Sequence, residues 1–125
     1  MVYLHQELTH EIIGAAIEVH RILGPGLLES VYEECLCHEL TLRKIPHERQ
    51  LMVTIDYKGL SIPKAYKLDV LVDHKVIVEI KAVVDMIPLF QAQLLTQLKL
   101  KNISVGLLIN FNVPILKEGV TRLVL

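Results

Sequence analysis

Two ionisable side chains interrupt a run of β-branched residues near the middle of the chain. Glu79 and Lys81 lie two positions apart in the segment 75–81 (KVIVEIK), so a strand would place both side chains on one face. Burying a charge costs free energy unless the charge is paired or bound to an ion. This segment is therefore the first place to expect chemistry.

A carboxylate on the strand predicted just before this segment could complete a site. A two-residue loop between the two strands would put Asp69 and Glu79 on opposite faces of the sheet. The three-residue loop 73–75 would instead pair Val72 with Val76. Asp69 would then lie opposite Glu79, and a shared site requires this register.

Two predicted helices each contribute one polar side chain beside apolar ones. Glu29 begins a helix over about 27–43 and falls at the border of its apolar arc. A first-turn carboxylate stabilised by the helix dipole would explain Glu29 equally well. Gln93 lies on a helix over 89–101 that Pro88 opens, on a stripe shared with leucines, where a buried amide needs a partner.

Together these residues suggest a divalent-metal site with an amine beside it. Asp69, Glu79 and Glu29 would supply the oxygen ligands that Mg²⁺ or Mn²⁺ prefers, with water completing the coordination. The metal would activate a bound water, which Lys81 and Gln93 could position. The alternative is a structural ion pair of Glu79 with Lys81, assisted by Asp69. Glu-x-Lys alone is a weak signal, and the additional polar residues strengthen it.

Length and composition favour one compact domain over residues 1–125. The chain is 52% hydrophobic with a net charge of −1, so any contact with nucleic acid must come from a local patch. No apolar run approaches the roughly 20 residues of a membrane-spanning helix. The first residues lack the basic start and apolar core of a secretory signal, so a cytoplasmic protein without a membrane partner is expected.

Hydrophobic periodicity predicts an α/β fold with the order α-α-β-β-β-α-β-β and a mixed central sheet flanked by helices. Lys58 and Gly59 form a hairpin turn signal, and Pro63 marks an edge or bulge near the start of the return strand. The apolar run 103–111 follows a helix and is expected to be a buried, parallel strand. The predicted helices are 9–23, 27–43 and 89–101, and the strands are 50–57, 66–72, 76–81, 103–111 and 121–125.

The sequence also resembles a known family. Residues 26–32 (GLLESVY) match the motif of the GxxExxY proteins, and the resemblance extends over nearly the whole chain. It covers residues 13–20 (IGAAIEVH), 23–26 (LGPG), 78–82 (VEIKA), 92–95 (AQLL) and 106–111 (GLLINF). That family is similar to a minimal member of the PD-(D/E)xK nuclease-like superfamily.

This resemblance implies a restriction-endonuclease-like core whose metal site contains Asp69, Glu79 and Lys81, with Glu29 and Gln93 as the usual additions. It further implies Mg²⁺ or Mn²⁺ as cofactor, nucleic acid as partner with DNA favoured over RNA, and a homodimer. The chain departs from the superfamily pattern at two positions. Leu68 stands where a proline is usual, and Gln97 stands where related motifs have a tyrosine.

Three further residues near the helix break at 24–26 each have two interpretations. His20 could be an extra ligand and Arg21 a phosphate contact, or both could stabilise a helix C-terminus. Tyr32 could donate its hydroxyl to a site carboxylate, or could be a core residue.

Two functions of different classes fit these residues. The first is a metal-dependent nuclease, a phosphodiester hydrolase with Asp69, Glu79 and Glu29 as ligands and with Lys81 and Gln93 positioning the water. The second is a nuclease-like fold without activity that serves as a binding or assembly module. A third, weaker hypothesis is a hydrolase of small phosphate compounds that uses the same site.

Overall fold

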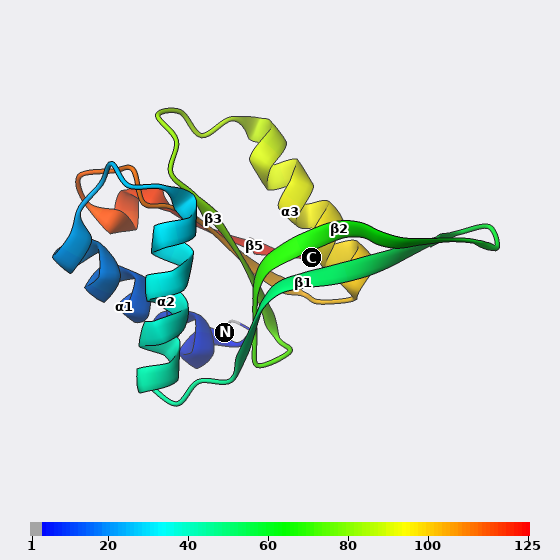
Figure 1. Ribbon diagram of the computed structural model, residues 1–125, viewed down its shortest axis with the longest axis horizontal. Helices are drawn as coiled ribbons and strands as arrows, with labels where there is room; N and C mark the ends of the chain where they lie inside the picture. The colour runs from blue at the N-terminus through cyan, green and yellow to red at the C-terminus, as the bar shows by residue number, and fades with distance from the viewer. Residues whose placement is uncertain (1–3) are drawn as a thin grey trace.

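A computed structural model describes residues 4–125, so the first residues examined for a secretory signal lie partly outside the described chain. It has the α/β architecture and the element order predicted from the sequence (Figure 1). The elements are α1 (Gln6–Leu23), α2 (Glu29–Leu42), β1 (His47–Tyr57), β2 (Leu60–Val72), β3 (Val76–Lys81), α3 (Pro88–Lys101), β4 (Val105–Asn110), the short 3₁₀ helix η1 (Leu116–Gly119) and β5 (Val120–Val124).

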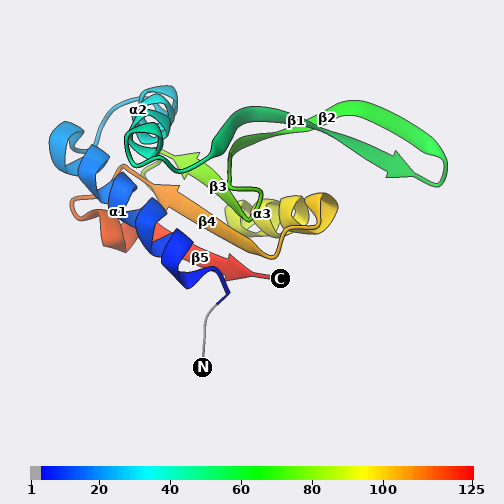
Figure 2. The ribbon, with the colours of Figure 1, turned by 90° about the horizontal axis from the view of Figure 1, so that it is seen from below.

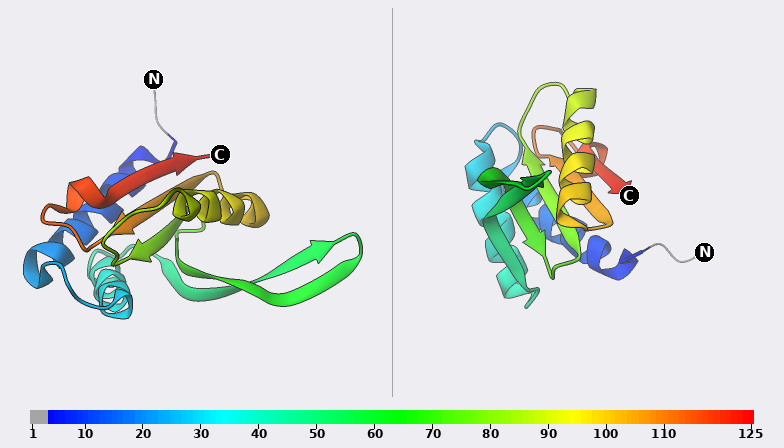
Figure 3. Two further views of the ribbon diagram at one scale, coloured as in Figure 1. Left: turned by 90° about the horizontal axis from the view of Figure 1, so that it is seen from above. Right: turned by 90° about the vertical axis from the view of Figure 1, so that its right-hand side faces the viewer.

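The five strands form one mixed sheet in the order β1-β2-β3-β4-β5. Strands β3 and β4 are parallel, as predicted for the apolar run that follows α3, and the other neighbours are antiparallel. Helices α1 and α2 cover one face of the sheet and α3 covers the other (Figure 3). Among residues 4–125 no helix has the length and hydropathy needed to cross a bilayer.

Strand alternation divides the core between these two faces. Val76, Val78 and Ile80 of β3 pack beneath α1 and α2, whereas Ile77 packs beneath Leu94 and Leu98 of α3. Glu79 and Lys81 continue the alternation that begins with Ile77, so the two residues that stood out in the sequence belong to the α3 side of β3.

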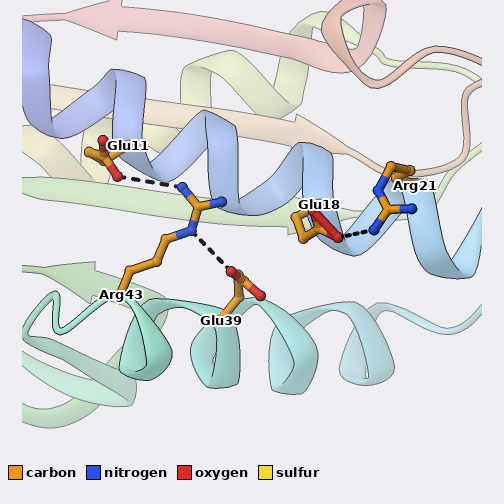
Figure 4. A network of polar contacts seen from close by, with 5 residues as sticks. All are labelled: Glu11, Glu18, Arg21, Glu39 and Arg43. Carbon is orange, nitrogen blue, oxygen red and sulfur yellow. Dashed lines mark hydrogen bonds and ion pairs between the residues drawn. The ribbon is translucent and has the colours of Figure 1, made fainter.

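Helix α1 begins three residues before the predicted start at Thr9. The Thr9 hydroxyl donates a hydrogen bond to the Gln6 carbonyl oxygen, 3.0 Å away, so Thr9 lies inside the first turn. Near the same end of α1, Arg43 at the C-terminus of α2 joins the two helices (Figure 4). Its guanidinium lies 3.0 Å from Glu39 and 3.4 Å from Glu11, and these exposed ion pairs contribute little stability individually.

The β1–β2 hairpin continues well beyond the rest of the sheet as a two-stranded arm (Figures 1 and 2). The predicted turn at Lys58 and Gly59 is confirmed, since both residues have a positive φ and Tyr57 pairs with Leu60 across them. The register shifts between Val53 and Ile55, opposite the segment that contains Pro63, which confirms an irregularity there.

A glycine in β4 sets the distance between the sheet and α3. A Cβ placed on Gly106 would lie 3.0 Å from Leu94 side-chain atoms, closer than carbon atoms normally approach. The glycine inside this otherwise apolar strand therefore permits a close contact between the strand and the helix.

We expect Gly106→Ala to lower the free energy of unfolding by about 1–3 kcal/mol, because the new methyl group overpacks the interface with Leu94. Urea unfolding of the wild type and the variant measures this change. Shortening the facing side chain in Gly106→Ala/Leu94→Val should recover part of the loss relative to the two single variants added together. Strict additivity would contradict the proposed contact.

Candidate active site

The predicted register between β2 and β3 is confirmed, and it brings Asp69 and Glu79 together. Val72 pairs with Val76 and Val70 pairs with Val78, so the loop has three residues. Backbone pairing between β2 and β3 ends at Val70 and Val78, and beyond that pair the Asp69 side chain binds the β3 backbone. Its Oδ2 accepts a hydrogen bond of 2.9 Å from the Ile80 N–H. We call this point, where β2 leaves β3, the fork.

The two carboxylates at the fork resist ionising together. Glu79 is buried, with 9% of its surface exposed, and its Oε1 lies 3.5 Å from the Asp69 backbone nitrogen. Desolvation, followed by repulsion from Asp69, raises the pKa of Glu79 to about 8. Desolvation also raises the pKa of Asp69, although the hydrogen bond from Ile80 opposes the shift. At neutral pH the pair therefore retains a proton or requires a cation.

Lys81 lies beside the acidic pair at the end of β3. Its ammonium favours the ionised forms of both Asp69 and Glu79, so it opposes part of the rise in the pKa of each carboxyl group. The Lys81 Nζ also lies 4.3 Å from the centre of the Phe90 ring, in the first turn of α3. This cation–π contact holds the half-buried amine between the fork and the helix.

Glu29 reaches the same end of the sheet from α2. Its Oε2 accepts a 3.3 Å hydrogen bond from the N–H of Ala82, the residue after Lys81. A shallow hollow beside this contact is lined by Leu27, Leu28, Glu29, Ser30 and Ala82.

The three expected carboxylate ligands are not assembled into one group. Within residues 4–125, no cluster of three or more His, Cys, Asp and Glu side chains could hold a metal ion. Asp69 and Glu79 nevertheless fit a divalent cation, because they supply two hard oxygen donors whose repulsion a cation would relieve. Mg²⁺ is often held by only one or two carboxylates, with water and phosphate oxygens completing its coordination.

Two glutamines of α3, Gln93 and Gln97, lie in different environments. Gln93 is exposed, one turn after Phe90, and makes no hydrogen bond to the acidic pair within the described chain. The expectation of a buried amide is therefore wrong for Gln93, because the rotation of α3 turns Leu94 rather than Gln93 into the core. Gln97 is partly buried, and its Oε1 has no hydrogen-bond partner among residues 4–125.

Tyr32 is a core residue, the second of its two interpretations. It is fully buried and stacks on Phe111, with 4.5 Å between the ring centres. Its hydroxyl donates to the Gly24 carbonyl and accepts from the Leu27 N–H, so it fixes the break between α1 and α2. The alternative, in which the Tyr32 hydroxyl donates to a site carboxylate or reaches substrate, is therefore wrong, because the hydroxyl donates to Gly24 and the side chain has no exposed surface.

His20 and Arg21 have contacts of their own at the end of α1. The His20 Nε2 lies 2.8 Å from the Val113 carbonyl oxygen, and this mostly buried ring does not reach the fork. Arg21 is exposed and pairs with Glu18 (Figure 4). Among the described contacts, neither residue touches Asp69 or Glu79.

Sequence reasoning missed a buried carboxylate next to the fork. Glu33, with 6% of its surface exposed, accepts hydrogen bonds from Nε and Nη2 of Arg49 at 3.2 and 2.9 Å. It also accepts one from Gln50, which lies between the residues paired with Val70 and Leu68. Glu33 thereby ties α2 to the strand beside Asp69, and its charge raises the pKa of Asp69.

A second missed residue fixes the chain just after Lys81. Asn110 is buried at the end of β4; its Nδ2 donates to the Val83 carbonyl at 3.0 Å, and its Oδ1 accepts from the Val83 N–H at 3.1 Å. A polar residue directly after the apolar run 105–109 was the available signal. For Glu33 the signal was helical spacing, because Leu36, Cys37 and Leu40 share its face.

A family model described as the PD-(D/E)XK nuclease superfamily matches residues 6–123. The chain belongs to the PD-(D/E)XK nuclease superfamily. Its mixed sheet with helices on both faces agrees with the restriction-endonuclease-like fold of that superfamily. Searches of curated proteins and of solved structures found no significant match.

We expect the buried pair of this PD-(D/E)XK protein to make its stability depend on pH. The pKa of Glu79 is raised from 4.5 to about 8, so between these values the folded state holds a proton that the unfolded chain releases. Without divalent cations, the free energy of unfolding should fall as pH rises through this window, by up to about 1.4 kcal/mol per pH unit.

Urea unfolding between pH 4.5 and 8 in EDTA measures this dependence. Glu79→Gln should give a flatter profile, because the amide cannot ionise, while replacing the exposed Glu34 by Gln should leave the slope unchanged. Parallel profiles for the wild type and Glu79→Gln would contradict the assignment.

Proposed function

We propose that the protein is a metal-dependent nuclease that hydrolyses phosphodiester bonds, with DNA as the preferred substrate. The observation that carries this proposal is the pair of carboxylates at the fork, held beside a lysine. Superfamily membership supports it, because PD-(D/E)XK nucleases generally use divalent metal ions.

Each side chain has a role in this proposal that follows from its position. Asp69 and Glu79 would hold Mg²⁺ or Mn²⁺, and the bound metal would supply Lewis acidity toward a phosphoryl oxygen and an activated water. Lys81, steadied by Phe90, orients the attacking water or neutralises charge that develops on the phosphate. Glu29 fixes the backbone just after Lys81, because its carboxylate accepts a hydrogen bond from the Ala82 N–H at the edge of the site. Gln93 is exposed on α3, where substrate could reach it.

A second candidate is a nuclease-like fold that binds without cutting. Two observations favour it. The described residues assemble only two acidic ligands, and Gln97 occupies a position where related motifs have a tyrosine. The two candidates differ in cleavage, and each predicts a different outcome for substitutions at Lys81.

Purified protein should cleave DNA in the presence of Mg²⁺ or Mn²⁺, and Lys81→Ala should slow cleavage by about 10²-fold or more, because it removes a charge aimed at the transition state. Gel analysis of labelled DNA and RNA substrates measures the rates. Lys75→Ala, an exposed lysine at the other end of β3, is the matched control and should retain full activity. Equal cleavage by the wild type and Lys81→Ala would exclude the proposed chemistry.

Metal binding should depend on the fork itself. Titration calorimetry with Mn²⁺ at pH 7.5 should show binding to the wild type and little or none to Asp69→Asn or Glu79→Gln, because each substitution removes one of the two oxygen ligands. Mn²⁺ binding to the wild type should release a proton, since the cation displaces the proton that Asp69 and Glu79 share. A folded wild type that binds no Mn²⁺ would favour the non-cutting module.

A further inference from the structure

The distal part of the β1–β2 arm has an apolar face that nothing in its own chain covers. Ile55 pairs with Ile62 and Tyr57 pairs with Leu60, so these four side chains share one face of the ribbon. The exposed fractions are 60% for Tyr57, 59% for Leu60 and 41% for Ile62.

Helix α3 covers the same face of the ribbon in the part of the hairpin nearer to β3. Val53 and Tyr66 pack with Leu94 and Leu98 of α3, and the arm then passes beyond the end of that helix (Figures 1 and 2). A two-stranded ribbon is marginally stable by itself in water, so an exposed arm of this length is suited to contact a partner.

The charge of the arm points to the nature of that partner. Residues 55–67, which form the distal part of the arm, carry Lys58, Lys64 and Lys67 against one acidic residue, Asp56, although the whole chain has a net charge of −1. All three lysines are exposed, and none makes an ion pair in the part of the chain that the structure describes. The arm is therefore a basic projection on a net acidic protein, which complements a polyanion.

The position of the arm connects it to the fork. Lys67 lies on β2 only two residues before Asp69, so the three lysines extend along the arm from its tip toward the fork. A two-stranded ribbon fits the major groove of B-form DNA, whereas the major groove of A-form RNA is too narrow and deep for it. Tyr57, Leu60 and Ile62 would supply apolar contacts to sugars and thymine methyl groups.

We propose that the β1–β2 arm binds duplex DNA, with Lys58, Lys64 and Lys67 contacting phosphates and thereby directing the duplex to the fork. This proposal rests on the proposed nuclease function for its biological meaning. Binding by the arm needs neither metal nor cleavage, so it is measured separately.

Fluorescence anisotropy with a labelled DNA duplex, in EDTA and at several salt concentrations, tests the proposal. The triple variant Lys58→Gln/Lys64→Gln/Lys67→Gln should bind at least about tenfold more weakly than the wild type. Its plot of log affinity against log salt should be shallower by about 2–3, since each lost phosphate contact removes roughly 0.9 from the slope.

The matched control removes the same charge elsewhere. Lys44→Gln/Lys75→Gln/Lys117→Gln replaces three exposed lysines that lie off the arm and should bind the duplex nearly as well as the wild type. Circular dichroism establishes that both triple variants are folded. Equal weakening by the two triple variants would overturn the proposal, because the effect would then reflect net charge alone.

The apolar face gives an independent test. If Ile62→Ser/Leu60→Ser converts a dimer to a monomer by light scattering and leaves DNA affinity unchanged, the face binds a second copy and the proposal is overturned. A monomeric wild type whose DNA affinity falls in this variant supports it. If the arm binds the duplex but the protein does not cleave it with either Mg²⁺ or Mn²⁺, the nuclease proposal fails while the proposal for the arm stands.

Discussion

Two carboxylates that are buried side by side cannot both ionise without a large cost in free energy, and the fork imposes this proximity on Asp69 and Glu79. The two carboxylates are close because β2 stops pairing with β3 at Val70. The Asp69 side chain then replaces a backbone hydrogen-bond partner for Ile80, next to Glu79. A stable fold would gain from an apolar residue at Glu79, which lies in an otherwise hydrophobic strand. Retaining the charge there is characteristic of a site that exchanges a proton for a cation.

Several contacts from neighbouring elements hold the fork in place. Glu33 accepts hydrogen bonds from Arg49 and Gln50 of β1, the strand that flanks β2 on the side opposite to β3. Asn110 fixes the backbone that follows Lys81, and Phe90 supports the Lys81 amine. These residues come from α2, β4 and α3, so every layer of the fold contributes to the geometry of one short stretch of β3.

The sequence was sufficient for the order of the elements, and the hypothesis of a shared site selected the correct register between β2 and β3. Apolar alternation left a two-residue and a three-residue loop open, and only a site shared by Asp69 and Glu79 required the three-residue loop that the structure contains. The fork itself was not predictable, because the place where two strands separate depends on the twist of the whole sheet. Glu33 was missed because a glutamate on a helix is usually exposed, and its partners are 16 and 17 positions away in the chain. The exposure of Gln93 depends on how α3 rotates against Gly106, which periodicity does not determine.

The arm also separates two kinds of evolutionary constraint within one hairpin. No residue between 54 and 65 belongs to the buried core, whereas residues 66–72 are bound to the core and to the fork. The outer part of the hairpin can therefore lengthen, shorten or change composition while the fold keeps its stability, as long as the pairing of Arg49 with Val70 is preserved. If the arm binds DNA as proposed, a change confined to this outer part would alter substrate preference while the acidic pair stays the same.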